Sequence, residues 1–156
     1  MASKRDKIKM SDAEIEAFLD ENRTLQVASI NKDGTPHLVA MWYARDAASG
    51  NLAFCTYGKS QKVLNVQRDP RLTVMVETGQ KYEELKGVTI YGTARIIDQL
   101  DDVLEFGERV YERYWGPIDN DMVRDGVRMM GAKRVVIVVE PTNVVSWDHT
   151  KLGGAY

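Results

Sequence analysis

The chain has 156 residues, of which 44% are hydrophobic and 28% are charged, and its formal net charge at neutral pH is -2. This length suits one domain with a hydrophobic core, and the balanced charge argues against nucleic-acid binding, which usually goes with a clear basic excess. The single cysteine, Cys55, excludes an internal disulfide, as is typical of proteins in a reducing cytoplasm.

Targeting and membrane signals are missing from the sequence. The first ten residues are charged and lack the apolar segment of a signal peptide. The longest aliphatic run, residues 135–139, is far too short to cross a bilayer. We therefore expect a cytoplasmic protein with no membrane partner. Residues 1–10 are expected to form a flexible basic leader, with cations at Lys4, Arg5, Lys7 and Lys9.

The first third of the chain predicts one helix and three strands. A capping box at Ser11 and Glu14, followed by an apolar stripe, predicts a helix over residues 12–21. Apolar and β-branched residues predict strands over 24–31, 37–45 and 52–56, with a hairpin turn at Asp33–Gly34. Because parallel neighbours need long crossovers, these closely joined strands should form an antiparallel meander.

The rest of the chain adds strands and two helices. Alternation predicts a strand over 72–78, and residues 85–98 form a long strand whose Gly87 and Gly92 suggest the bulges that close a barrel. Helices are predicted over 100–115 and 121–130, and two short strands over 134–140 and 143–148, separated by Pro141. The predicted fold is mainly β, or α+β, and consists of an antiparallel barrel with peripheral helices in a single domain, residues 1–156.

Residues 52–70 form the most informative stretch, which reads as strand, tight turn and short helix. Ser60 is a suitable N-cap, and Asp69–Pro70 ends the helix. Lys59 and Lys62 stand beside the free N–H groups of the first turn, an arrangement that favours a bound phosphate. The alternative is a capped surface helix with solvated lysines, and the motif alone leaves both interpretations open.

Reactive side chains in recognisable motifs are absent. His37 and His149 have no partner at zinc-binding spacing, so we expect no metal. Asp148 and His149 are adjacent and point to opposite faces of a strand, which favours a surface pair over an acid/base pair. Cys55 lies in an apolar strand, which favours a packed thiol. We expect no catalytic side chain, so any chemistry would come from a cofactor.

Several motifs have a distinctive order and spacing along the chain: the N-terminal helix, residues 31–36, 39–43, 56–62, Asn65, 68–71, and the long strand with Gly87 and Gly92. Together they resemble the split-barrel flavin-binding proteins of the pyridoxamine 5'-phosphate oxidase-like superfamily. The resemblance covers about residues 12–149, and the ending at 145–154 is most similar to an actinobacterial subgroup that uses the deazaflavin F420 in place of FMN. Gln61–Lys62 stands where pyridoxamine phosphate oxidases typically carry Arg–Lys, which argues against that reaction itself.

The resemblance implies a homodimer with two cofactor sites at the subunit interface. It implies that the cofactor phosphate is held by Lys59, Ser60, Gln61 and Lys62. The ring is expected along residues 39–42 and near Thr56, and alternation along a strand would let only one of Met41 and Trp42 face it. The expected ring contacts are Val39, Met41, Trp42, Thr56 and Tyr57.

The expected function is that of an F420-dependent oxidoreductase that transfers a hydride between the deazaflavin and a small organic electrophile, such as an enone or quinone. The alternatives are an FMN-binding oxidase or flavin reductase of the same fold, and a non-enzymatic F420 carrier. F420 carries a phosphodiester and an oligoglutamate tail, which extra cations should bind. The candidates are the basic leader, of the same or a partner subunit, together with Arg68 and Arg71.

Overall fold

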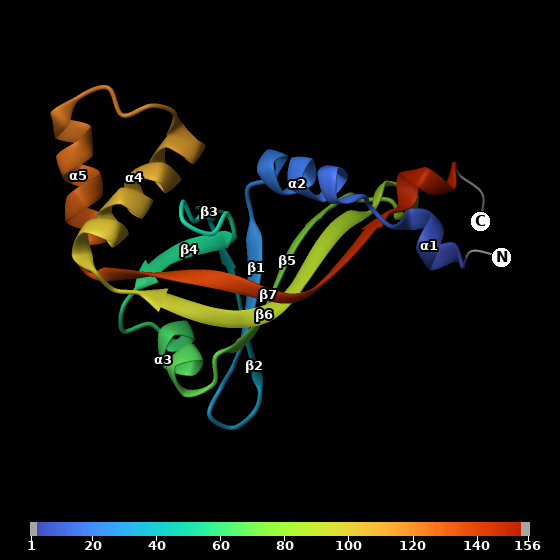
Figure 1. Ribbon diagram of the computed structural model, residues 1–156, viewed down its shortest axis with the longest axis horizontal. Helices are drawn as coiled ribbons and strands as arrows, with labels where there is room; N and C mark the ends of the chain where they lie inside the picture. Colours follow the sequence, from blue (N-terminus) through green and yellow to red (C-terminus); the bar gives the residue numbers. More distant parts are fainter. Residues whose placement is uncertain (1–2, 154–156) are drawn as a thin grey trace.

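One curled, seven-stranded antiparallel sheet forms the centre of the fold, with helices around it (Figure 1). The computed structural model describes residues 3–153; Met1 and Ala2 of the leader and residues 154–156 lie outside the described residues. The strands are β1 (Leu25–Ile30), β2 (Pro36–Met41), β3 (Ala44–Arg45), β4 (Leu52–Tyr57), β5 (Arg71–Thr78), β6 (Lys86–Ile97) and β7 (Arg134–Asp148). The helices are α1 (Lys4–Ile8), α2 (Asp12–Glu21), α3 (Gln61–Arg68), α4 (Leu100–Trp115) and α5 (Asp121–Gly131), with short 3-10 turns η1 (Tyr82–Glu84) and η2 (His149–Leu152).

The sheet is a split barrel, which confirms the predicted fold class. Its strand order is β2-β1-β5-β6-β7-β4-β3, so β2 and β3 are the two edges. Only Trp42 and Tyr43 separate these edge strands in the sequence. Because each residue spans at most about 3.6 Å, the two edges must approach one another at this point. The barrel is therefore closed by the chain itself and not by hydrogen bonds.

The single strand expected over residues 37–45 is wrong, because the chain leaves β2 after Met41. Tyr43 is 1% exposed, and its hydroxyl donates to the carbonyls of Leu19 at 2.6 Å and Asn22 at 2.9 Å. Burial of this ring against the end of α2 turns the backbone inward and ends the first edge strand. The β1–β2 hairpin confirms one half of the expected meander, while β3 pairs with β4 at the opposite edge.

Pro141 does not break the last strand, contrary to the sequence prediction. β7 continues through it, and the register with β6 shifts between Tyr91 and Gly92, where Gly92 pairs with Pro141. At this bulge the ladder does not need the N–H that proline lacks. The hydroxyl of Thr142 donates to the carbonyl of Tyr91 at 3.1 Å. A Cβ on Gly92 would lie 2.2 Å from the carbonyl oxygen of Glu140, so the bulge requires glycine.

Apolar side chains fill both faces of the strands that carry the site. Phe54 of β4 and Ile137 of β7 belong to the core inside the barrel. Their neighbours Ala53 and Val136 pack on the other face, in a second cluster with Val103 and Phe106 of α4. Since both faces are covered, β4 and β7 read as continuous apolar runs in the sequence. This second cluster fixes α4 against the outside of the barrel.

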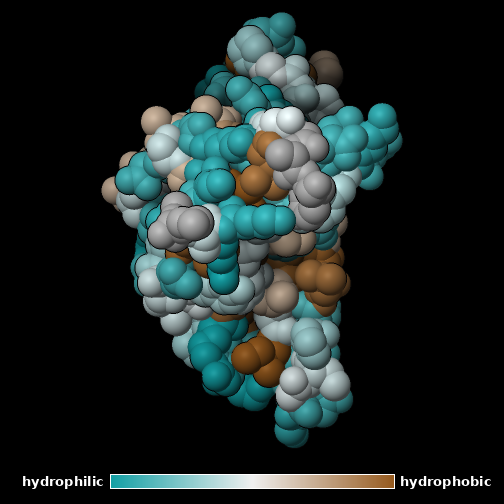
Figure 2. All heavy atoms as spheres, turned by 90° about the vertical axis from the view of Figure 1, so that its right-hand side faces the viewer, coloured by the Kyte–Doolittle hydropathy of each residue, from teal (hydrophilic) through white to brown (hydrophobic). Residues whose placement is uncertain are grey.

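The N-terminal segment packs at the end of the molecule far from α3 and α5 (Figure 1). Ser11 and Glu14 form the predicted capping box, and α2 has the predicted bounds. The leader contains the short helix α1, and after it the backbone N–H of Met10 donates to Ser146 Oγ at 3.1 Å. Viewed onto this end, the surface is largely hydrophilic, with hydrophobic atoms in separate patches (Figure 2). No described helix is long and apolar enough to span a bilayer.

Candidate functional site

The N-terminus of α3 carries a small polar cluster of Thr56, Ser60 and Lys62. Ser60 takes the N-cap position, but its side chain makes no cap hydrogen bond. Its hydroxyl lies 3.3 Å from Thr56 Oγ1 at the end of β4, and Lys62 Nζ donates to the same Thr56 oxygen at 3.0 Å. The Ser60 side chain therefore does not cap the first turn, although the N–H of Val63 donates to the backbone carbonyl of Ser60 at 3.0 Å. The ammonium of Lys62 lies beside this end of the helix.

Lys62 is a partly buried cation. Burial lowers the pKa of Lys62 below its ordinary value, and the positive charge of Arg134 lowers it further. The strand pairing explains this proximity, because Arg134 at the start of β7 lies opposite Tyr57 at the end of β4. In the described part of the chain, neither Lys62 nor Arg134 forms an ion pair with a carboxylate, in contrast to Lys86 and Asp148 at 3.0 Å. Anionic groups bound beside these two half-buried cations would relieve the repulsion between them.

The other residues of the motif have separate roles. Gln61 donates from Nε2 to Asn65 Oδ1 at 2.8 Å. Asn65 is fully buried and donates from Nδ2 to Ser29 Oγ and Asn31 Oδ1, both at 3.0 Å. These bonds tie α3 to β1 and hold its N-terminus in place. Lys59 is exposed, so its ammonium can reach a ligand at the helix end only from the solvent side.

Two further cations expected to bind a coenzyme tail have protein partners. Arg71 forms an ion pair with Asp69 at 2.6 Å, and hydrogen bonds from Arg71 lower the pKa of Asp69 to about 2. Arg68 donates to the carbonyl of Ile30 and to Asn65 Oδ1. Both arginines thus serve the C-terminal end of α3 in this chain.

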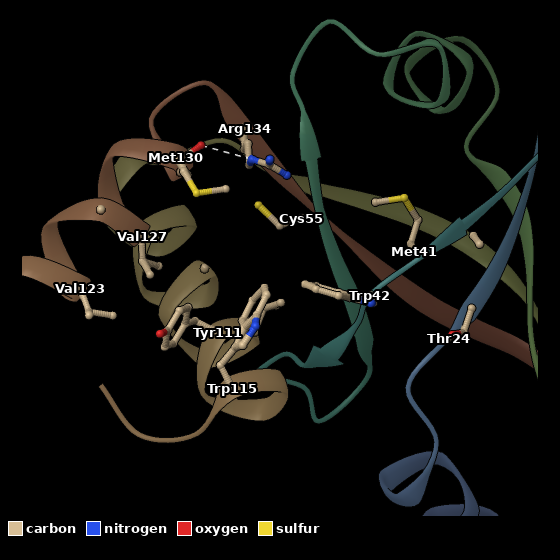
Figure 3. A pocket seen from close by; sticks show the side chains of 15 residues that line it. Thr24, Met41, Trp42, Cys55, Tyr111, Trp115, Val123, Val127, Met130 and Arg134 are labelled. Atoms are coloured by element: carbon tan, nitrogen blue, oxygen red, sulfur yellow. Dashed lines mark hydrogen bonds between the residues drawn. The ribbon is translucent and has the colours of Figure 1, made fainter. Parts of the chain in front are cut away.

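A cavity of about 830 Å³ lies between the end of β2, β4, the start of β7 and the hairpin of α4 and α5 (Figure 3). Its walls are mostly apolar and aromatic. Trp42 stacks on Tyr114 with ring centroids 4.5 Å apart and meets the edge of Trp115 at 4.7 Å. Tyr111 lies 5.1 Å from Trp115 and extends the aromatic wall. A site of this size and character suits a flat organic molecule.

The predicted ring contacts divide between this cavity and its surroundings. Met41 and Trp42 both line it, although strand alternation would allow only one, because β2 ends at Met41 and Trp42 belongs to the link between the edges. Thr56 is 3% exposed and belongs to the α3 cluster. Val39 packs against the barrel core, and Tyr57, 49% exposed, does not line the cavity.

Sequence reasoning missed the contributions of β7 and of the two late helices. Among the described residues that line the cavity, Arg134 alone carries a charge. Its Nε donates to the carbonyl of Met130 at 3.2 Å. Cys55 also lines the cavity and is not wholly packed away; burial raises the pKa of its thiol, against the opposing charge of Arg134. The sequence signal for these helices was the large apolar side chains Trp115 and Met130 near the ends of the two predicted helices. Both side chains are exposed in the structure.

The residues present fit a phosphorylated redox coenzyme. The uncapped end of α3 and the half-buried Lys62 suit a phosphate, and the adjoining aromatic cavity suits a ring. Metal binding has no comparable support, since His, Cys, Asp and Glu side chains of residues 3–153 form no group of three or more placed to hold an ion.

Two solved structures are similar to this chain over most of its length. A conserved hypothetical protein from Mycobacterium tuberculosis, Rv2991, is 40% identical, with a TM-score of 0.90 over 99% of this chain and 95% of that one. A solved F420 reductase is 27% identical, with a TM-score of 0.63 over 83% of this chain and 94% of that one.

Among curated proteins, the F420H(2)-dependent biliverdin reductase of Mycobacterium tuberculosis is 26% identical over 129 residues, which cover 83% of this chain and 82% of that protein. The family model described as pyridoxamine 5'-phosphate oxidase matches residues 11–148. Because this match spans most of the sequence, the chain belongs to the pyridoxamine 5'-phosphate oxidase family.

Proposed function

We propose that the chain is an F420-dependent reductase that acts on a small organic electrophile, such as an enone or quinone. The observation that carries the proposal is the half-buried Lys62, beside the uncapped end of α3 and close to an aromatic cavity. Two relatives named for F420 chemistry support the choice of coenzyme.

Each part of the site has a role in this proposal. Lys59, Ser60, Gln61 and Lys62 bind the coenzyme phosphate, with the first-turn N–H groups of α3 and the charge of Lys62 as the main contacts. The bound coenzyme would supply a hydride to an electrophilic carbon of the acceptor, with a solvent proton completing the reduction.

The protein contributes orientation and exclusion of water, and the proposed reaction requires no acid or base side chain. Met41 and Trp42 line the cavity and are the proposed contacts of the ring. Val39, Thr56 and Tyr57 complete the proposed set at its border.

We also propose that two copies of the chain form a homodimer with the coenzyme at their interface. Large apolar side chains are exposed in one copy, including Leu38 at 69%, Tyr91 at 46% and Met122 at 85%. A partner subunit would cover such side chains. Size-exclusion chromatography with light scattering tests this directly, since a monomer at micromolar concentration contradicts it.

Titration of the purified protein with F420 and with FMN tests the proposed function. Absorbance and fluorescence changes on binding give an affinity for each coenzyme. The proposal predicts tight binding of F420 and weak binding of FMN. The reverse preference would favour the flavin oxidase or flavin reductase alternative. Oxidation of reduced F420 by a panel of enones and quinones, measured against a protein-free blank, then separates an enzyme from a carrier.

A further inference from the structure

Two glycines keep the cavity beneath α4 and α5 open, although glycine lowers the stability of both helices. Gly107 lies inside α4 and Gly126 inside α5, and both line the cavity. A Cβ built on Gly126 meets nothing within 4 Å, and one on Gly107 meets only a methyl of Val127 at 4.0 Å. Glycine in a helix interior costs about 1 kcal/mol relative to alanine. Packing therefore does not require glycine at these positions, and its effect is to leave room.

Gly131, at the end of α5, is a glycine that packing does require. A Cβ there would lie 2.8 Å from a methyl carbon of Leu104, so close packing of the two helices explains this glycine. The same explanation fails for Gly107 and Gly126. What these two positions leave is space for a ligand against the aromatic wall of Trp42, Tyr111 and Trp115.

One guanidinium faces this apolar space. Figure 3 shows Arg134 at the rim, beside Met130 and near Cys55. The two arginines of α5, Arg124 and Arg128, both pair with Glu108, at 3.9 and 2.8 Å. Arg134 has no carboxylate partner in the described part of the chain, and the carbonyl of Met130 occupies only its Nε. Its remaining N–H groups form the planar fork that binds a carboxylate in two parallel hydrogen bonds.

From this arrangement we infer that the cavity takes a flat, largely apolar organic acid, whose rings lie against Trp42 and Trp115 and whose carboxylate binds Arg134. If the proposed function holds, this ligand is the hydride acceptor, and it occupies the cavity together with the coenzyme. The α3 cluster is left to the coenzyme phosphate, so the two anionic groups bind to different cations.

Two fluorescent probes with the same ring system test the inference on the purified full-length chain. Anilinonaphthalene sulfonate carries apolar aromatic rings and one anionic group, and N-phenylnaphthylamine is its uncharged counterpart. Both should bind with enhanced fluorescence. Arg134→Gln should weaken binding of the sulfonate about tenfold or more and leave the neutral probe unchanged. Lys133→Gln removes one charge from the adjacent, exposed position, and should change neither affinity.

A second pair of variants tests the location. Gly126→Phe fills the open space beside α5 and should abolish binding of both probes, with circular dichroism as the check on folding. Val123→Trp, at another lining position, repeats the test if the first variant does not fold. Unchanged binding of both probes to the folded variants would place the ligand elsewhere and overturn the inference.

Three further outcomes complete the test. An Arg134→Gln variant with wild-type affinity for the sulfonate would overturn the assigned role of the guanidinium. Displacement of the sulfonate by saturating F420 would make the cavity the coenzyme site alone and would also overturn the inference. Failure of F420 to bind, with the probe pattern intact, would remove the proposed function and leave the acid-binding cavity standing.

Discussion

Lys62 donates a hydrogen bond from its ammonium to the hydroxyl oxygen of Thr56 at 3.0 Å, across the turn that joins β4 to α3. This contact directs the side chain back toward the helix N-terminus instead of into solvent. The bond leaves two ammonium hydrogens for a ligand, because a lysine has three donors. The contact joins the end of the strand, the turn and the first turn of the helix into one local unit.

Replacement of Lys62 by alanine should weaken binding of the coenzyme. A charge-assisted hydrogen bond contributes about 1.5–3 kcal/mol, so the dissociation constant should rise roughly ten- to a hundredfold. Isothermal titration with F420 measures it. Lys32→Ala, in the exposed turn between β1 and β2, removes the same charge away from the site and serves as the control. Equal affinities of the Lys62→Ala protein and the wild type would mean that the phosphate binds elsewhere.

Coenzyme affinity should depend on pH through Lys62. The phosphate binds the protonated ammonium, so affinity is constant at low pH and falls as the pH rises through the pKa of this group. Burial and Arg134 lower this pKa, and the fall should therefore begin at a lower pH than for an ordinary lysine. Lys62→Arg should bind without this decline, because a guanidinium stays charged. A decline of the same shape in both proteins would assign the titration to another group.

Alanine should have opposite effects at Gly92 and Gly126. At Gly92 a Cβ would lie 2.2 Å from a backbone oxygen of β7, so the free energy of unfolding should fall by about 1–3 kcal/mol or more. At Gly126, within α5, a Cβ meets no atom within 4 Å. The free energy of unfolding should therefore rise by up to about 1 kcal/mol. Urea denaturation of the two variants measures both effects. Destabilisation by Gly126→Ala would contradict the open space beside this residue.

Elements with strong local signals could be predicted from the sequence, whereas breaks set by distant contacts could not. The capping box at Ser11 and the glycine at Gly116 give α2 and α4 their predicted bounds. The break after Met41 depends on the burial of Tyr43 against α2, and the passage of β7 through Pro141 depends on pairing with Gly92. Neither dependence is visible in the local pattern.

The candidate site also has one part that the local sequence predicts and one part that depends on distant contacts. Ser60 and Lys62 could be predicted to lie together because they belong to one turn–helix segment, and Thr56, expected near the ring, contacts both of them. The cavity could not, since it brings together Trp42 and Arg134 from opposite halves of the chain. Their proximity follows from the strand order of the sheet, in which β4 pairs with β7.

Deletion of residues 1–9 should weaken F420 binding in a salt-dependent way if the basic leader binds the acidic tail of the coenzyme. In one chain α1 lies at the far end of the molecule from α3 (Figure 1), so the leader that reaches the tail would belong to the partner subunit. Affinity measured at low and high ionic strength tests this, because salt screens such contacts. The truncated protein should approach the wild type at high salt. Identical affinities at low salt would remove the leader from the site.

A crystal structure with bound F420 tests the central claim most directly. The account predicts phosphate oxygens within about 3 Å of Lys62 Nζ and of the first-turn N–H groups of α3, with the ring against Met41 or Trp42. A phosphate bound away from α3, with Lys59 and Lys62 directed into solvent, would contradict it.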